Sequence, residues 1–420
     1  MDEYILGLGE KAKEASKKLA ILDTNAKNAV LTAVSKALIE KKDLIKAENK
    51  KDLEYGREKG ISSALLDRLE LTDSRIEGMA KSLIEIANFK DPIGEILEGW
   101  KHPDGMQILK QRVPLGVIGM IFESRPNVTI DSAGLALKSS NAIILRGGSD
   151  AINSNKVLKN IFMEEGKKHG LPDGAVQLIE NTDREIVKDF IRLNKYIDVI
   201  IPRGGKGLKN FIIGNATVPV IETGAGLCHI FVDETADIQK AIPIIENAKT
   251  QRCNTCNTIE TLLVHENAAE KLLPELSRVL HNDKVEIRAD EKAFEIIKKS
   301  GIEVKKATEE DWETEYLELI LSVKTVKNIE EAIQHIDRYS TQHSDAILTE
   351  NLENAEKFIN EIDSAAVYVN ASTRFTDGGE FGYGGEIGIS TQKLHSRGPM
   401  GIRELTTIKY IIRGNGQIRK

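Results

Sequence analysis

A chain of 420 residues is longer than one hydrophobic core usually serves, so we expect two or three domains. A charged content of 29% and a formal net charge of −7 are typical of a soluble globular protein and do not favour nucleic-acid binding. No apolar run approaches the roughly 18 residues of a membrane span, and the acidic N-terminus lacks the apolar core of a signal peptide. Three cysteines are too few for a disulfide framework, so we expect a cytoplasmic enzyme.

The N-terminal region, residues 1–92, has the pattern of charged amphipathic helices, and Thr72-Asp73 is a typical cap for one of them. We expect these helices to pack on a sheet and to carry no chemistry. Residues 94–112 contain two short runs around the Pro-Asp-Gly turn at 103–105 and predict a β-hairpin. The alternating tail 405–413 predicts a strand that could pair with this hairpin.

Strands and helices alternate from Leu115 onward. We expect strands at 116–122, 141–145, 176–179, 198–202 and 218–222, with helices at about 130–138, 152–169 and 183–193. This order predicts a parallel, doubly wound sheet with its ligand site at the carboxyl ends of the strands. A strand at 228–232, a helix at 236–250 and a second alternation from 259 to about 369 follow, with a domain boundary near 224–227.

Two glycine-rich turns each follow a buried strand and precede a helix. They are Arg146-Gly147-Gly148-Ser149 and Arg203-Gly204-Gly205-Lys206-Gly207. Glycines let the backbone approach a phosphate there, and N–H groups at a helix start favour an anion. Neither turn matches a standard fingerprint, so either alone could be an ordinary turn. Two in one sheet favour a dinucleotide or sugar-phosphate ligand.

The three cysteines have different surroundings. Cys228 lies in an apolar run and is expected to be a small core side chain. Cys253 and Cys256 form C-x-x-C before an apolar strand, which could be a redox pair, half of a metal site or the location of one nucleophilic thiol. A second C-x-x-C is absent from the sequence, so zinc is not favoured. Spacing alone does not rank the two cysteines.

Charged residues near glycine-rich segments are further candidates. Glu222 follows four apolar residues, which makes a solvated face a poor explanation for it. Glu315 lies in the acidic, helix-like run 311–318, where a solvated face is the simplest interpretation. Arg374 precedes the glycine-rich run 381–390 and is a candidate for binding a carboxylate or phosphate.

Nine segments between residues 112 and 407 are similar to the sequences of one known family. They are, in order, RVPLGVIGMIFESRPNVTID, NAIILRGGSDA, VIIPRGGKGL, VPVIETGAGLCHIFVD, CNTIETLLVH, DWETEYLELILSVK, HSDAI, VYVNASTRFTDGGEFGYGGEIGIS and LHSRGPMGIRELTT. They resemble the γ-glutamyl phosphate reductases of the aldehyde dehydrogenase superfamily. The resemblance implies an aldehyde dehydrogenase-like α/β fold. A Rossmann-type NADP-binding domain (1–93 and 113–224), an α/β catalytic domain (225–385) and a small β oligomerisation element (94–112 and 402–420) are expected.

The resemblance also implies a set of site residues. Cys256 begins the CN-x-x-ETLLVH segment and is the expected nucleophile, which leaves Cys253 as an additional thiol. Asn127 is the expected oxyanion-hole amide, together with the backbone N–H of Cys256. Residues expected to bind NADPH or NADP are Arg146, Gly147, Gly148, Ser149, Pro202, Arg203, Gly204, Gly205, Glu222, Thr223, Gly224 and Glu315. Arg146 is expected at the 2′-phosphate and Glu315 at the nicotinamide ribose. Expected substrate-binding residues are Arg125, Asn370, Ser372 and Arg374.

The implied reaction is the NADPH-dependent reduction of γ-glutamyl 5-phosphate to glutamate 5-semialdehyde and phosphate through a thioester on Cys256. It is the second step of proline biosynthesis from glutamate. We expect a homo-oligomer, functional coupling to glutamate 5-kinase, and no metal, nucleic acid or membrane. One alternative is a non-phosphorylating aldehyde dehydrogenase on the same scaffold. Another is an inactive or RNA-binding relic of the fold, against which the set of Cys256, Asn127 and Glu315 and the acidic balance argue.

Overall fold

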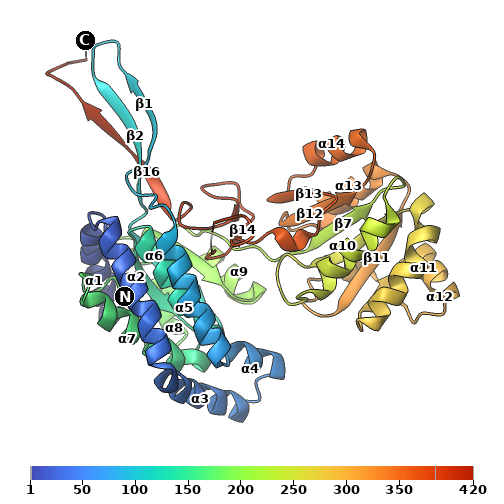
Figure 1. The fold of residues 1–420 in the computed structure, drawn as a ribbon, viewed down its shortest axis with the longest axis horizontal. Helices are drawn as coiled ribbons and strands as arrows, with labels where there is room; N and C mark the ends of the chain where they lie inside the picture. Colours follow the sequence, from blue (N-terminus) through green and yellow to red (C-terminus); the bar gives the residue numbers. More distant parts are fainter. Residues whose placement is uncertain (1, 384, 420) are drawn as a thin grey trace. The chain divides into compact units, whose positions relative to one another are not determined.

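The computed structural model describes residues 2–383 and 385–419, which fall into two compact units (Figure 1). The first unit comprises Met1–Thr223, Gly382–Gly388 and Met400–Lys420, and the second comprises Gly224–Phe381 and Ile389–Pro399. Each unit has its own parallel sheet and its own apolar core.

Five helices open the first unit. They are α1 (Glu3–Leu19), α2 (Thr24–Glu40), α3 (Lys42–Glu58), α4 (Ser63–Leu69) and α5 (Asp73–Asn88). Four of them begin at a side-chain cap, because the side chains of Asp2, Asp23, Ser62 and Thr72 accept backbone N–H groups of the following turn. The helical prediction for this region and the predicted cap at Thr72 are confirmed.

A four-stranded parallel sheet, in the order β5-β4-β3-β6, follows these helices in the first unit. Its strands are β3 (Val117–Phe122), β4 (Ala142–Arg146), β5 (Val176–Leu178) and β6 (Val199–Arg203). The connections contain α6 (Asn127–Lys138), the 3-10 turn η1 (Ser149–Ala151), α7 (Ile152–Lys167) and α8 (Glu185–Phe190), and α9 (Lys206–Asn215) follows β6. The strand order reverses between β3 and β6, and ligands of such sheets bind outside the carboxyl ends at this point.

Two predicted helix boundaries and one predicted strand in this part of the chain are wrong. Helix α6 begins at Asn127 rather than near residue 130, because Pro126 already has helical dihedrals (φ −58°, ψ −31°). Helix α8 covers only Glu185–Phe190 of the predicted 183–193. The predicted strand at 218–222 is a single bridge between Val220 and Ile200, because Pro219 has no N–H to donate to a ladder.

The predicted hairpin and tail form a separate antiparallel sheet in the first unit, in the order β1-β2-β16. Its strands are β1 (Ile96–Lys101), β2 (Gln107–Pro114) and β16 (Thr406–Arg413). The predicted pairing of the tail with the hairpin is confirmed, and these strands extend away from the helices of the first unit (Figure 1). Trp100 and Tyr410 are exposed on this sheet and contact each other edge to face, with ring centroids 6.3 Å apart.

The second unit is built on a seven-stranded parallel sheet in the order β10-β9-β11-β8-β7-β12-β13. Its strands are β7 (Cys228–Val232), β8 (Ile259–His265), β9 (Glu286–Ala289), β10 (Lys305–Lys306), β11 (Ile320–Val326), β12 (Ser344–Leu348) and β13 (Ala366–Val369). The helical elements are α10 (Ile238–Thr250), α11 (Glu266–Asn282), α12 (Glu291–Lys299), η2 (Glu309–Glu313), α13 (Ile329–Tyr339), α14 (Leu352–Glu361) and η3 (Thr373–Phe375), and β14 (Ile389–Ser390) pairs with β15 (Gly398–Pro399).

Alternate residues of the central strand β7 face opposite sides of this sheet. Ile230 and Val232 pack in the core beneath α10, α11 and α12, whereas Phe231 packs in the core beneath α13 and α14. The strand therefore presents buried apolar side chains on both faces, as buried parallel strands do. Within the described residues, no helix combines the length and the apolar character needed to cross a membrane.

Candidate active site

Cys256 lies in the loop 251–258, which leads from α10 into the amino end of β8. We call this segment the nucleophile loop. Side-chain hydrogen bonds close it into a tight turn: the Thr255 hydroxyl donates to the Arg252 carbonyl (3.0 Å), and the Thr258 hydroxyl donates to the same oxygen (2.7 Å). The half-buried Cys256 is therefore held by a turn with a fixed backbone course.

Two residues fix the backbone of Cys256 from the side of β7. A Cβ atom on Gly226 would overlap the carbonyl oxygen of Cys256, so only glycine fits this approach. The Cys228 thiol donates to the same carbonyl oxygen at 3.2 Å. Burial raises the pKa of the Cys228 thiol well above its usual value, which keeps the donor protonated. Cys228 is buried as predicted, but its contact with Cys256 was not predicted.

Glu315 is joined to the same backbone. Its Oε1 atom accepts the N–H of Gly226 at 2.7 Å, and Gly226 in turn packs on Cys256. The simplest interpretation of the acidic run, a solvated helix face, is wrong, because η2 ends at Glu313 and Glu315 is half-buried. The structure thus connects the Glu315 carboxylate to the backbone of Cys256 through Gly226.

Arg374 also contacts the nucleophile loop. Its Nε donates to Gln251 at 2.8 Å, and its Nη1 donates to Thr255 at 2.8 Å and to the side chain of Asn257. Burial, and then the neighbouring Arg252, lower the pKa of the guanidinium. Two cations therefore lie at the loop that carries Cys256, where they favour a thiolate.

The other expected substrate-binding residues of this segment have structural contacts. Ser372 is buried and caps η3 by accepting the N–H of Arg374 at 3.3 Å. Asn370 has a positive φ of 54°, and its carboxamide is bonded to both backbone groups of Thr349 at 2.8 and 2.9 Å. This contact lies at the carboxyl ends of β12 and β13, whereas Cys256 precedes the amino end of β8.

A buried ion pair lies beside the nucleophile loop. Lys249 Nζ is 2.6 Å from Glu260 Oε2, and both side chains have no exposed surface. Burial raises the pKa of Glu260 to about 7 and lowers that of Lys249, each opposed by the partner's charge. Neither residue was predicted from the sequence as part of a site.

In the first unit, the turn after β4 presents an incompletely bonded guanidinium. Arg146 donates to the carbonyl oxygens of Gly147 (3.1 Å) and Thr182 (3.3 Å), but its buried Nε has no hydrogen-bond partner in the described part of the chain. Burial and the nearby Arg184 lower its pKa. An anion would satisfy this donor and offset the repulsion between the two arginines. Gly148 and Ser149, where η1 begins, complete the turn.

Arg184 was not predicted as a site residue, although its position in the sequence gives a signal. The residue follows the third strand of the sheet, at the same carboxyl edge as the two glycine-rich turns. Because parallel strands bring their carboxyl ends together, a cation after β5 is a candidate for binding an anion at this edge.

The turn after β6 receives an anionic oxygen from within the chain. The N–H of Gly205, the N-cap of α9, donates to Glu123 Oε2 at 2.9 Å. A Cβ atom on Gly204 would lie 2.6 Å from the same oxygen, so the carboxylate sits directly on the backbone. The carboxylate oxygen of Glu123 shows that this helix start accepts an anion, as a phosphate oxygen would be accepted. Glu123 was also missed by sequence analysis.

The remaining expected cofactor residues lie at the end of β6 or beyond it. The Thr223 hydroxyl donates to the Pro202 carbonyl at 2.5 Å, and this bond ties the segment 218–223 to the strand end. Arg203 ends β6, and Glu222 is half-buried next to Thr223. Gly224 opens the second unit, where its backbone approaches Thr391.

Asn127 is the exposed first residue of α6, and its carboxamide is oriented by a neighbour. Its Nδ2 donates to Asp131 Oδ2 at 3.0 Å, one helical turn further on. Burial raises the pKa of Asp131 to about 6, opposed by hydrogen bonds from Asn127 and Ser82. Arg125, half-buried, precedes Pro126 at the start of the same helix.

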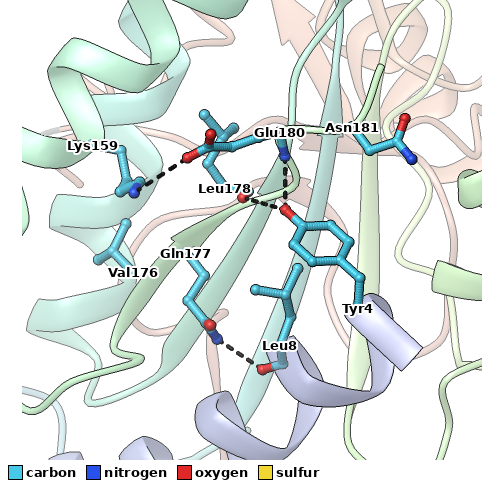
Figure 2. A pocket seen from close by; sticks show the side chains of 8 residues that line it. All are labelled: Tyr4, Leu8, Lys159, Val176, Gln177, Leu178, Glu180 and Asn181. Carbon is cyan, nitrogen blue, oxygen red and sulfur yellow. Dashed lines mark hydrogen bonds and ion pairs between the residues drawn. The ribbon is translucent and has the colours of Figure 1, made fainter. Parts of the chain in front are cut away.

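An open pocket of about 660 Å³ lies elsewhere in the first unit (Figure 2). It is lined by Tyr4, Leu8, Lys159, Val176, Gln177, Leu178, Glu180 and Asn181. Its polar groups bond one another: the Tyr4 hydroxyl accepts the N–H of Glu180 (3.0 Å), and Gln177 donates to the Leu8 carbonyl (2.8 Å) (Figure 2). None of the predicted site residues lines it. No group of three His, Cys, Asp or Glu side chains among the described residues is arranged to hold a metal ion.

Comparison with known proteins identifies the family. The model of the aldehyde dehydrogenase family matches residues 8–296 and 303–411. The chain is 58% identical over 415 residues to the γ-glutamyl phosphate reductase of Francisella philomiragia, covering 99% of both chains, and 57% identical over 419 residues to that of Clostridium botulinum, covering 100% of both. The crystal structure of γ-glutamyl phosphate reductase from Thermotoga maritima has a TM-score of 0.95 and 52% identity, covering 99% of this chain and 100% of that one. The chain belongs to the γ-glutamyl phosphate reductases of the aldehyde dehydrogenase family. The predicted family and fold are confirmed, and the alternative of a non-phosphorylating aldehyde dehydrogenase is not favoured.

Proposed function

We propose that this enzyme reduces γ-glutamyl 5-phosphate to glutamate 5-semialdehyde and phosphate with NADPH, the second step of proline biosynthesis from glutamate. One observation carries the proposal beyond the family relationship: the loop of Cys256 is fixed by Gly226 and Cys228 and is joined to the carboxylate of Glu315. A half-buried thiol with a fixed backbone beside two arginines is suited to nucleophilic attack on an anionic acyl phosphate.

In the proposed reaction the Cys256 thiolate attacks the acyl carbon of the substrate. The bond from this carbon to the phosphate oxygen breaks, phosphate leaves with the electron pair, and a thioester remains on Cys256. The carboxamide of Asn127 and the backbone N–H of Cys256 are assigned to the tetrahedral oxyanion, where one donor contributes about 10²–10³ in rate. Bound NADPH supplies the hydride that reduces the thioester. The resulting thiohemiacetal alkoxide re-forms its carbonyl group, expels the thiolate and releases the semialdehyde.

Two arginines of the second unit lie in this loop or contact it. Arg374 and Arg252 provide the positive potential that attracts the anionic substrate and stabilises the thiolate. We retain Arg125 and Ser372 as proposed contacts. For Asn370, whose carboxamide is bonded to Thr349, we propose an indirect contribution through the course of the segment that carries Arg374.

NADPH is the proposed cofactor, and the first unit offers the groups that fit it. Arg146 with its partnerless Nε, together with Arg184, suits the 2′-phosphate. The pyrophosphate is proposed to lie at the start of α9, in the turn formed by Pro202, Arg203, Gly204 and Gly205. Gly147, Gly148, Ser149, Glu222, Thr223 and Gly224 are proposed to line the remainder, and Glu315 to bind the nicotinamide ribose. Glu222 is assigned to cofactor positioning because phosphate, unlike water, needs no general base to attack in the reverse direction.

We further propose that the enzyme is a cytoplasmic homo-oligomer. The sheet β1-β2-β16 exposes apolar side chains, among them Trp100 and Tyr410, with which a second copy could pair. Replacing both with serine should lower the molecular mass measured by light scattering. Coupling to glutamate 5-kinase is proposed because an acyl phosphate hydrolyses readily when free in water.

The reverse reaction tests the proposal. Glutamate 5-semialdehyde and NADP should give NADPH only when inorganic phosphate is present, and γ-glutamyl phosphate should appear in equal amount. NADPH formation without phosphate, yielding glutamate, would instead indicate a non-phosphorylating dehydrogenase.

A further inference from the structure

We propose that the buried pair Lys249–Glu260 is a positioning pair, which closes the nucleophile loop and fixes Glu315 relative to Cys256. The proposal rests on the proposed function through the roles of Cys256 and Glu315. Lys249 lies in the last turn of α10, and Glu260 lies near the start of β8. The two residues therefore flank the nucleophile loop, and their contact joins its ends.

The ammonium group of Lys249 makes two contacts across the loop. It is 2.6 Å from Glu260 Oε2 and donates to the backbone carbonyl of Ile259 at 3.1 Å. The Lys249 side chain on α10 thus bonds both a side chain and the backbone of β8, the strand that follows the loop. Loop ends fixed by directed bonds restrict the positions that Cys256 can adopt between them.

The second carboxylate oxygen of Glu260 extends the arrangement to Glu315. Glu260 Oε1 accepts the N–H of Leu317 at 3.2 Å. Leu317 has a φ of 55°, a backbone conformation that a branched residue rarely adopts and that surrounding contacts must hold. Just before it in the chain, Glu315 accepts the N–H of Gly226, which packs on Cys256. Glu260 therefore bonds to Lys249, at one end of the nucleophile loop, and to Leu317, in the segment that carries Glu315.

Stability alone does not explain such a pair. Removing two charges from water is costly, and a well-packed apolar pair is commonly at least as stable as a buried ion pair. An apolar pair, however, would supply neither the bond to Ile259 nor the bond to Leu317. The directed bonds are what the ionic pair adds.

The rate of Cys256 alkylation by iodoacetamide measures the effect directly. Cys253→Ala is the parent protein for this experiment, so that labelling, counted by intact mass, reports Cys256; Cys228 is fully buried. Glu260→Gln keeps an oxygen for Leu317 but removes the charge opposite Lys249. We expect it to slow alkylation and lower kcat by about 10-fold, in the range for residues that orient a reactive group, with an unchanged KM for NADPH.

A double variant, Lys249→Met with Glu260→Met, removes both charges and so avoids leaving one buried and unpaired. It also removes the acceptor of the Leu317 N–H. We therefore expect slow alkylation together with a several-fold higher KM for NADPH, because Glu315 is no longer fixed. This variant tests the proposal even if Glu260→Gln fails to fold.

The matched control is the pair Lys27–Asp91 in the first unit, whose side chains are 1% and 11% exposed and whose Nζ–Oδ2 distance is 2.7 Å. Asp91→Asn should lower the melting temperature but leave alkylation and KM unchanged. Alkylation of both Glu260 variants at the parental rate, each measured equally far below its own melting temperature, would show a merely structural pair and overturn the proposal. Failure of the proposed function is a separate result: Cys256→Ala would keep its turnover, whatever the alkylation rates.

Discussion

The carboxamide of Asn127 and the carboxylate of Asp131 are hydrogen-bonded at 3.0 Å across one turn of α6. The bond uses one N–H of the carboxamide and directs that group, leaving the other N–H for a further acceptor. If Asn127 stabilises the oxyanion, Asp131 sets its orientation. The pair therefore predicts coupled effects of substitution.

A double-mutant cycle tests this coupling. Asn127→Ala should lower kcat by about 10²–10³, the cost of one oxyanion donor. Asp131→Ala should lower kcat less, by about 10-fold, with little effect on the KM for NADPH, because the donor is present but misdirected. The double variant should be no slower than Asn127→Ala alone. Multiplicative effects would mean that the residues act independently.

The same carboxylate predicts a pH-dependent stability. Burial raises the pKa of Asp131 from 3.8 to about 6, so the folded state holds this proton more tightly than the unfolded state does. Its contribution to the free energy of unfolding is favourable below about pH 3.8 and is lost as the pH rises through about 6. Asp131→Asn should therefore raise the melting temperature at pH 8, and the gain should shrink towards pH 4. A gain that stays constant between these pH values would contradict the shift.

The two cysteines of the nucleophile loop should behave differently. Cys256→Ala should abolish turnover because no thioester can form. Cys253→Ala should keep most of the activity, since Gly226 and Cys228 contact the Cys256 backbone directly. Steady-state reduction of γ-glutamyl phosphate measures both. A dead Cys253→Ala variant that is folded would move the nucleophile to that residue.

Cofactor preference should depend on Arg146 and Arg184. A charge-assisted hydrogen bond contributes about 1.5–3 kcal/mol, so losing the bond from Arg146 to the 2′-phosphate should lower kcat/KM for NADPH by about 10-fold or more. The value for NADH should change little. Arg184→Ala should act in the same direction through charge alone. The control is Arg192→Ala, an exposed arginine of the same unit that also bonds a carbonyl oxygen (3.2 Å). Equal loss for NADH and NADPH would exclude a 2′-phosphate contact.

Local patterns predicted the elements of this fold well where burial and periodicity agree. The strands β7 and β8 were found because each holds a run of apolar residues, 230–232 and 262–264, between polar segments. The segment 218–222 is also apolar but does not form a strand, since Pro219 interrupts the hydrogen-bond ladder with β6. The start of α6 was placed too late, because Pro126 already has helical dihedrals and the helix begins directly after it at Asn127.

The site was predicted less completely, because its contacts join segments far apart in the sequence. Glu315 lies in an acidic run that resembles a solvated helix, and only its bond to Gly226 distinguishes it. Lys249 and Glu260 are separated by a loop whose path no periodicity describes. Asp131 and Arg184 belong to the site because they lie beside Asn127 and Arg146. The family resemblance named Asn127 and Arg146 but not these neighbours.

The hydrogen bond from the Gly205 N–H to the Glu123 carboxylate affects which anions can bind at the start of α9. At the helix start where we place the cofactor pyrophosphate, the N–H of Gly205 already donates to the Glu123 carboxylate, which would compete with a bound anion. A free phosphate ion, which gains a single anchoring point, must displace that carboxylate unaided, whereas a dinucleotide brings further contacts along its length. We therefore expect Glu123→Gln to bind NADPH more tightly and to be inhibited more strongly by simple anions.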